Sequence, residues 1–148
     1  MLRERDMKKR ELRADGLIPW AVFAVWVAVA IAISWDDRQF ALSGPVGFAK
    51  VVLIAVWLGF LAYSWHCMRY ENFVKSVREI WDKYWGRQII VDLYISVFLS
   101  IALVFLVTGS IWQTLFWSIA MIPFANQAIL LFVILYLDEI IAMLGLLG

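Results

Sequence analysis

The chain has 148 residues, of which 64% are hydrophobic and 17% charged, and its formal net charge is +1. A soluble domain is about half apolar and about a quarter charged, so this composition excludes an ordinary soluble domain and favours an integral membrane protein. The small net charge, with no basic stretch interleaved with aromatic residues, gives no reason to expect a nucleic-acid partner. At this length, residues 1–148 are expected to form a single membrane domain.

The first two predicted spans follow a charged N-terminal arm, residues 1–16. The uncharged stretch 17–35 is long enough to cross a hydrocarbon layer of about 30 Å, and it predicts the first span. A link rich in Asp, Gly and Pro predicts a turn. The second span is predicted over residues 47–67. Lys50 lies one turn inside it, close enough to the surface for its ammonium group to reach water.

An amphipathic helix is predicted over residues 69–85, between the second and third spans. Its apolar residues recur with i, i+3, i+4, i+7 spacing. Its polar face carries the pairs Glu71–Lys75 and Glu79–Lys83, with the acid first, which is the stabilising order. The apolar face fits the lipid headgroup region, the ends of the protein's own helices, or a partner. As a docking face for a partner it comprises Tyr70, Phe73, Val77, Trp81 and Tyr84.

The third and fourth spans are predicted over residues 89–107 and 111–137. Gly86 is expected to end the amphipathic helix before the third span begins. The connection Thr-Gly-Ser is short, so the two spans should be antiparallel neighbours. The fourth stretch is long enough to cross with tilt, and Pro123 near its middle predicts a kink.

The fourth span has a competing interpretation. Residues 111–124 could form a re-entrant or surface segment, with residues 127–147 as the last span. Asp138 and Glu139 would then lie near the centre of the bilayer, at a cost of about 2.5–3.5 kcal/mol each. We therefore predict an all-α, integral membrane four-helix bundle, with one cytoplasmic or interfacial amphipathic helix between the second and third spans.

The distribution of Lys and Arg predicts the orientation. Six lie in the N-terminal arm, two between Trp35 and Lys50, five from Arg69 to Arg87, and none after Arg87. The positive-inside rule places the arm and the amphipathic helix in the cytoplasm. With four spans, both termini are cytoplasmic. We expect a multi-pass protein of the cell (inner) membrane.

Asp92, Ser96 and Ser100 recur at i, i+4 and i+8, and they predict a polar stripe on the third span. An ionisable residue inside a span is a functional candidate, and the stripe could line a water-filled path. Alternatively, Asp92 anchors the helix start beside Lys83 or Arg87, and the stripe is a helix–helix interface. Rows of small residues on the first two spans also favour such interfaces: Ala24, Ala28, Ala32, Ala55 and Gly59.

A second polar group lies in the fourth span and comprises Pro123, Asn126 and Gln127. Proline removes a backbone donor and frees the carbonyl of Ile119. Two carboxamides at bilayer depth need partners, either from another helix or from a ligand. Such helix breaks form substrate and ion sites in transporters, and they also occur as plain kinks.

His66 is the single histidine and lies at the cytoplasmic end of the second span. One histidine excludes a self-contained bis-histidine haem and the His-rich zinc sites, so we predict no metal site and assign no cofactor. His66 is expected to be hydrogen-bonded at the interface, or to ligate a pigment or haem shared with a partner chain. The chain also lacks a Ser/His/Asp set and a glycine-rich phosphate loop, so no enzymatic activity is expected.

Taken together, these features favour a non-catalytic accessory or structural subunit of a larger membrane complex. Its expected partners are the lipid bilayer and other integral membrane chains. The alternative is a small homo-oligomeric channel or transporter, built around the Asp92 stripe and the helix break at Pro123.

Overall fold

A computed structural model describes residues 2–35 and 42–145 of the chain. This part is all-α, as predicted, and contains no strand. Its seven helices are α1 (Leu2–Ile33), α2 (Gly44–Tyr70), α3 (Phe73–Trp81), α4 (Tyr84–Thr108), α5 (Ile111–Phe124), α6 (Asn126–Leu135) and α7 (Leu137–Met143).

Two of the described helices, α2 and α4, are long and apolar enough to cross a membrane. Helices α6 and α7 pass the same test only as a pair, and they are bent by 74° where they meet. The apolar part of α1, Leu17–Ile33, and the whole of α5 are shorter apolar helices. The described residues therefore indicate a membrane protein, but they do not clearly provide the four spans that the sequence predicted.

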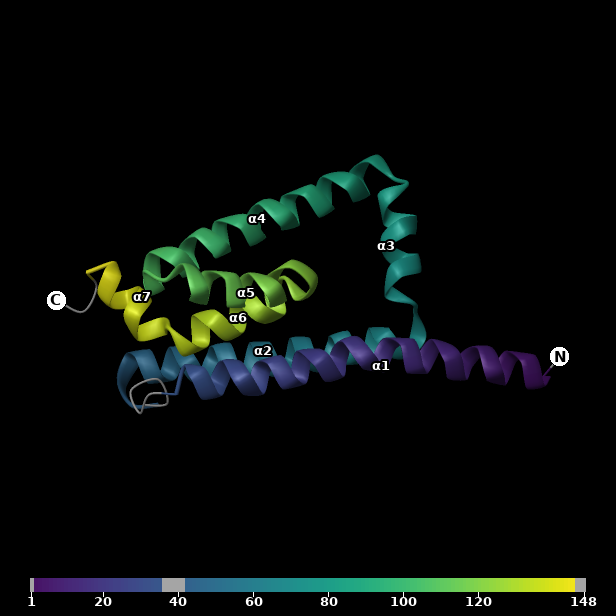
Figure 1. Cartoon of the computed structure of the whole chain (residues 1–148), viewed down its shortest axis with the longest axis horizontal. Helices are drawn as coiled ribbons and strands as arrows, with labels where there is room; N and C mark the ends of the chain where they lie inside the picture. Colours follow the sequence, from purple (N-terminus) through teal and green to yellow (C-terminus); the bar gives the residue numbers. More distant parts are fainter. Residues whose placement is uncertain (1, 36–41, 146–148) are drawn as a thin grey trace.

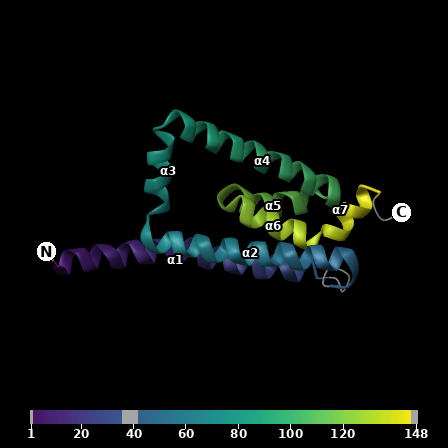
Figure 2. The same ribbon diagram turned by 180° about the vertical axis from the view of Figure 1, so that it is seen from behind.

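The long helices run along one axis of the molecule, and α3 stands across it where α2 ends and α4 begins, with the start of α1 reaching beyond it (Figures 1 and 2). The chain runs one way in α1, returns in α2, crosses in α3 and runs back in α4. Helix α5 then folds back beside α4, and α6 packs against α2, α4 and α5. As a result, the start of α1 and α7 lie at opposite ends of the molecule (Figure 1).

The connection between α4 and α5 is a tight glycine turn. Gly109 caps α4 with a positive φ of 61°, and its N–H donates to the carbonyl of Phe105. Ser110 caps α5, its side chain accepting a hydrogen bond from the N–H of Gln113. Glycine adopts the left-handed conformation without a steric penalty. The predicted antiparallel pairing of the helices on either side of this turn is confirmed.

The predicted fourth span, residues 111–137, is not one helix. Helix α5 ends at Phe124, Ala125 has φ 38° and ψ −114°, and α6 begins at Asn126 and returns along α5. Pro123 lies in the last turn of α5, where its missing N–H helps to end the helix. The proline therefore accompanies a reversal of the chain and not a kink. The competing interpretation, in which residues 111–124 form a separate segment, is closer to the structure.

The hydrophobic core is built around the aromatic rings of α5 and α6. Trp117 is 1% exposed, and its ring centroid lies 5.0 Å from those of Trp26 on α1 and Phe132 on α6. Phe132 stacks on Tyr136 with centroids 4.7 Å apart. Aromatic side chains bury more area than any others, so these contacts hold the α5–α6 hairpin against α1.

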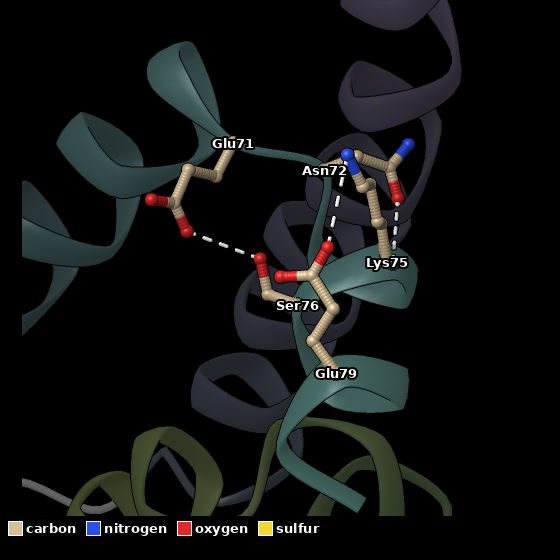
Figure 3. Close-up of polar contacts among 5 residues, drawn as sticks. All are labelled: Glu71, Asn72, Lys75, Ser76 and Glu79. Carbon is tan, nitrogen blue, oxygen red and sulfur yellow. Dashed lines mark hydrogen bonds and ion pairs between the residues drawn. The ribbon is translucent and has the colours of Figure 1, made fainter. Parts of the chain in front are cut away.

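The amphipathic helix is shorter than predicted. Glu71 leaves the helical conformation after α2, and Asn72 caps α3 by accepting a hydrogen bond from the N–H of Lys75 (Figure 3). The carboxylate of Glu71 instead accepts from the hydroxyl of Ser76, and Lys75 pairs with Glu79 at 3.7 Å (Figure 3). The predicted Glu71–Lys75 pair is therefore wrong, because the helix on which it depended is broken between the two residues.

The turn between α3 and α4 lies at residues 82–83, and not at Gly86 as predicted. Gly86 is buried in the first turn of α4, where an added Cβ would lie 1.8 Å from the carbonyl oxygen of Ile80. A glycine is needed there because the start of α4 passes so close to the end of α3. Glu79 pairs with Lys75, so the predicted Glu79–Lys83 pair is also not formed.

Candidate functional site

An ion pair joins α2 to α7 across a large separation in sequence. The ammonium group of Lys50 donates to the carboxylate of Asp138. The Lys50 side chain is only 1% exposed, whereas that of Asp138 is 37% exposed. A buried ammonium group is tolerated only with charged or hydrogen-bonding partners, so this pair fixes α7 on the first turns of α2. The prediction that Lys50 reaches water is wrong.

A second polar contact lies beside the junction of α6 and α7. The hydroxyl groups of Ser34 and Tyr136 are 3.1 Å apart and share a hydrogen bond. Ser34 follows α1, so the end of α1 and the start of α2 are both held at this junction. Asp138 therefore lies near the start of α2.

The pairing of Lys50 with Asp138 was not predicted from the sequence. One signal was available: each is a charge at the edge of a long uncharged stretch, and opposite charges in apolar surroundings tend to pair. The sequence alone gave no reason to choose Asp138 over other acids, because the pair depends on the return of α6 toward the start of α2.

Gln127 is the polar residue most deeply placed in the α5–α6 hairpin, with an exposed fraction of 5%. The indole N–H of Trp57 donates to its backbone carbonyl at 2.9 Å, and its amide nitrogen donates to the hydroxyl of Ser64 at 3.0 Å. Of the two expected kinds of partner, another helix or a ligand, α2 therefore supplies one to the amide nitrogen of Gln127. Its side-chain oxygen has no hydrogen-bond partner among the described residues. Asn126 and Pro123, by contrast, are exposed at the tip of the hairpin.

The stripe of Asp92, Ser96 and Ser100 runs along α4 beside its buried face. Val97 and Val104, at 1% and 0% exposure, are in the core, whereas Asp92 and Ser96 are exposed and Ser100 is half-buried. The hydroxyl of Ser96 donates to the carbonyl of Asp92 at 3.2 Å, and that of Ser100 to the carbonyl of Ser96 at 2.8 Å. The two hydroxyl groups thus bond within their own helix.

The carboxylate of Asp92 has no hydrogen bond or ion pair in the part of the chain that the structure describes, where both ion pairs lie elsewhere. Arg87, one of its expected partners, donates to the carbonyl of Trp81 at 2.8 Å and lies over the ring of Tyr84. The ion pair expected to anchor Asp92 at the start of the helix is therefore not formed.

The rows of small residues lie on outward faces. In α1, Phe23 and Ala30 point into the core. In α2, a Cβ added at Gly59 would meet nothing within 4 Å. Packing among the described residues does not use these rows, all of whose members are exposed: Ala24, Ala28 and Ala32 on α1, and Ala55 and Gly59 on α2.

The predicted docking face is largely exposed, but it is shared by three helices. Tyr70 ends α2, Tyr84 begins α4, and Phe73, Val77 and Trp81 lie on α3. Phe73 is 73% and Tyr84 87% exposed, whereas Val77 is half-buried. The aromatic residues therefore lie along α3 and at the ends of the two helices that it joins, α2 and α4 (Figure 1).

His66 is exposed near the end of α2, and its ring lies 4.8 Å from that of Tyr70. The neighbouring Cys67 is an exposed free thiol. Within residues 2–35 and 42–145, no group of three His, Cys, Asp or Glu side chains is placed to share a metal ion. The observed ring contact of His66 is with a tyrosine at the helix end.

The chain matches no described protein family, and no curated protein or solved structure shows a detectable similarity to it. Three features of the described residues stand out: the outward rows of small residues, the carboxylate of Asp92, which pairs with no described side chain, and the hairpin with its ion pair at Asp138.

Proposed function

We propose that this chain is a non-catalytic membrane subunit that assembles with other integral membrane proteins. The outward position of its small residues carries this proposal. Helices gain little from hydrophobic burial inside lipid, so their association depends on close backbone approach and on hydrogen bonds. Rows such as Ala24, Ala28 and Ala32 permit that approach, and no described helix of this chain covers them.

In the proposed topology, α1, α2 and α4 cross the bilayer, and α5 and α6 form a re-entrant hairpin. Helix α5 has 14 residues. At 1.5 Å per residue this is about 21 Å, which is too short for a hydrocarbon layer of about 30 Å. The arm at the start of α1 lies at the same end as α3 (Figure 1). Both are rich in Lys and Arg, so the positive-inside rule favours the cytoplasm for this end.

This topology changes one expectation from the sequence. With three crossings and a hairpin that returns to its own side, α7 emerges on the side opposite the arm. The N-terminal arm is then cytoplasmic and the C-terminal end is not. Placement in the cell (inner) membrane belongs to the same proposal.

Helix α3 supports this placement. It stands across the long axis between the end of α2 and the start of α4 (Figure 2). Its exposed Phe73 and Trp81 suit the headgroup region, where aromatic side chains are enriched. The same exposed aromatic side chains could also contact the cytoplasmic part of a partner protein.

The proposal is tested by extracting the full-length chain in mild detergent, sizing it and identifying every protein in the peak. We expect other integral membrane proteins to elute with it. Ala28→Leu and Gly59→Leu should each release the chain from the complex, because the added bulk separates the backbones. Val25→Leu is the matched control, since this position is already branched and 66% exposed. A stable monomer that neither substitution changes would refute the proposal.

A homo-oligomeric channel or transporter is the second candidate, and the α5–α6 hairpin favours it. Half-helices that meet inside the bilayer form ion and substrate sites in transporters. Here the break lies beside the buried Gln127, whose side-chain oxygen is unpaired among the described residues. A homo-oligomer without any other protein, with ion flux in liposomes that Gln127→Leu abolishes, would favour this function over the first.

A further inference from the structure

We propose that the exposed side of α4 around Asp92 binds a membrane-spanning helix of another protein, and that this helix carries a Lys or Arg side chain at the depth of Asp92. The inference rests on the proposed function and specifies the chemistry of the partner. It follows from the depth of the carboxylate, its lack of a partner, and the surface around it.

Asp92 lies inside the apolar part of α4. It is eight residues after Tyr84, the first residue of the helix, which is about 12 Å along the axis at 1.5 Å per residue. It is the only charged residue between Arg87 and the end of α4 at Thr108. Asp92 is three residues after Ile89, where the apolar stretch begins. A carboxylate at the centre of such a stretch costs about 2.5–3.5 kcal/mol on the insertion scale and less toward its ends, and such residues usually face protein and pair with another group.

The described part of this chain does not supply that group. The guanidinium of Arg87 is directed to the carbonyl of Trp81. Lys50 lies near the start of α2, paired with Asp138, at the end of the molecule far from the start of α4 (Figure 1). The hydroxyl of Ser96 donates to a backbone carbonyl of its own helix. None of the described side chains is thus the complementary cation, and we assign that role to a basic side chain of another protein.

The surface around Asp92 fits a helix in lipid better than a soluble peptide. Ile89 is 61% and Leu99 68% exposed, and both lie on the same face as Asp92 and Ser96, at helical spacing. Apolar side chains thus flank a single carboxylate. The small Ser96 one turn further on allows a second backbone to approach closely.

A second copy of this chain is a poor occupant of this face. Two copies with the same orientation, paired through α4 about a twofold axis, would bring the two Asp92 carboxylates together. Like charges in close contact cost several kcal/mol. The favoured occupant is therefore a different membrane protein with a basic residue in or near its span.

The first test uses the full-length, tagged chain extracted from its native membrane in mild detergent. We expect Asp92→Asn to lower the amount of retained partner about tenfold or more, which corresponds to about 1.4 kcal/mol or more. Asp92→Glu should retain most of it. Asp82→Asn is the matched control, because this acid is exposed at the end of α3, outside the proposed face. Full retention by Asp92→Asn would overturn the inference and leave the proposed function standing.

The second test identifies the occupant directly. A photoreactive amino acid at Leu99 should crosslink to a different integral membrane protein upon illumination of intact membranes. Crosslinks only to lipid, or to a second copy of this chain, would overturn the inference. If the wild-type chain carries no other protein at all, the proposed function fails as well, so the two failures are distinguishable.

Discussion

The ion pair between Lys50 and Asp138 provides the sharpest stability prediction. Asp138→Asn replaces the carboxylate by a neutral amide but leaves the ammonium group in place, with 1% of its side chain exposed. Removing one partner of a fully buried pair costs about 3–5 kcal/mol, since the other charge remains buried. Asp138 itself is 37% exposed, so solvent already screens the pair. We therefore expect Asp138→Asn to lower the free energy of unfolding by about 2–3 kcal/mol, which is less than the cost for a fully buried pair.

Substitutions that remove the cation should lower the free energy of unfolding less than Asp138→Asn does. Lys50→Met keeps the length of the side chain and removes its charge, and the carboxylate left behind can still be hydrated. The double variant Lys50→Met/Asp138→Leu removes both charges and replaces them with apolar groups, which is often neutral or stabilising for a buried pair. The double variant should thus be more stable than Asp138→Asn, and the cycle should reveal coupling between the two sites.

The assay is reversible unfolding in mixed micelles of a mild detergent and sodium dodecyl sulfate. The chain has nine tryptophans, and Trp117 is buried in the core, so their fluorescence reports the folded fraction. The reasoning is refuted if Asp138→Asn is as stable as the wild type, or if the effects of the two sites simply add.

Three further predictions address the turns and the topology. Ala125→Gly should stabilise the hairpin by about 1 kcal/mol in the same assay, because Ala125 has a positive φ of 38° that glycine adopts without strain; a loss of stability would contradict this. Gly86→Ala should destabilise by at least about 1–3 kcal/mol, since its Cβ would lie 1.8 Å from the carbonyl oxygen of Ile80; wild-type stability would show that the two helices are not so close. A reporter fused after Gly148 should lie on the opposite side of the membrane from one fused before Met1, and equal labelling of both from the cytoplasm would restore the four-span arrangement.

The sequence predicted the long helices and one of the turns because those features leave local signals. Apolar stretches of membrane length, each with a single charge, predicted α2 and α4, and Gly109 with Ser110 predicted the turn between α4 and α5. The polar stripe along α4 followed from helical spacing. Asn72 was also a local signal, since asparagine is a preferred N-cap residue, but the amphipathic period across it concealed the break between α2 and α3.

The hairpin was harder to predict. Residues 111–137 carry no charge and are mostly apolar, so hydrophobic periodicity does not show where a helix reverses. Pro123 is compatible with either a kink or an end, and Ala125 is not a typical turn residue. Lys50 and Asp138 meet only because the hairpin returns the chain to the start of α2. No local pattern could have joined two residues so far apart in sequence.

The central claim is that this chain works in association with other membrane proteins. Native mass spectrometry of the tagged chain, released directly from membrane vesicles, tests this most directly. Our account predicts complexes heavier than the 17.1 kDa chain that dissociate into this chain and at least one different protein. Only the monomer, or only whole multiples of its mass, would contradict the account.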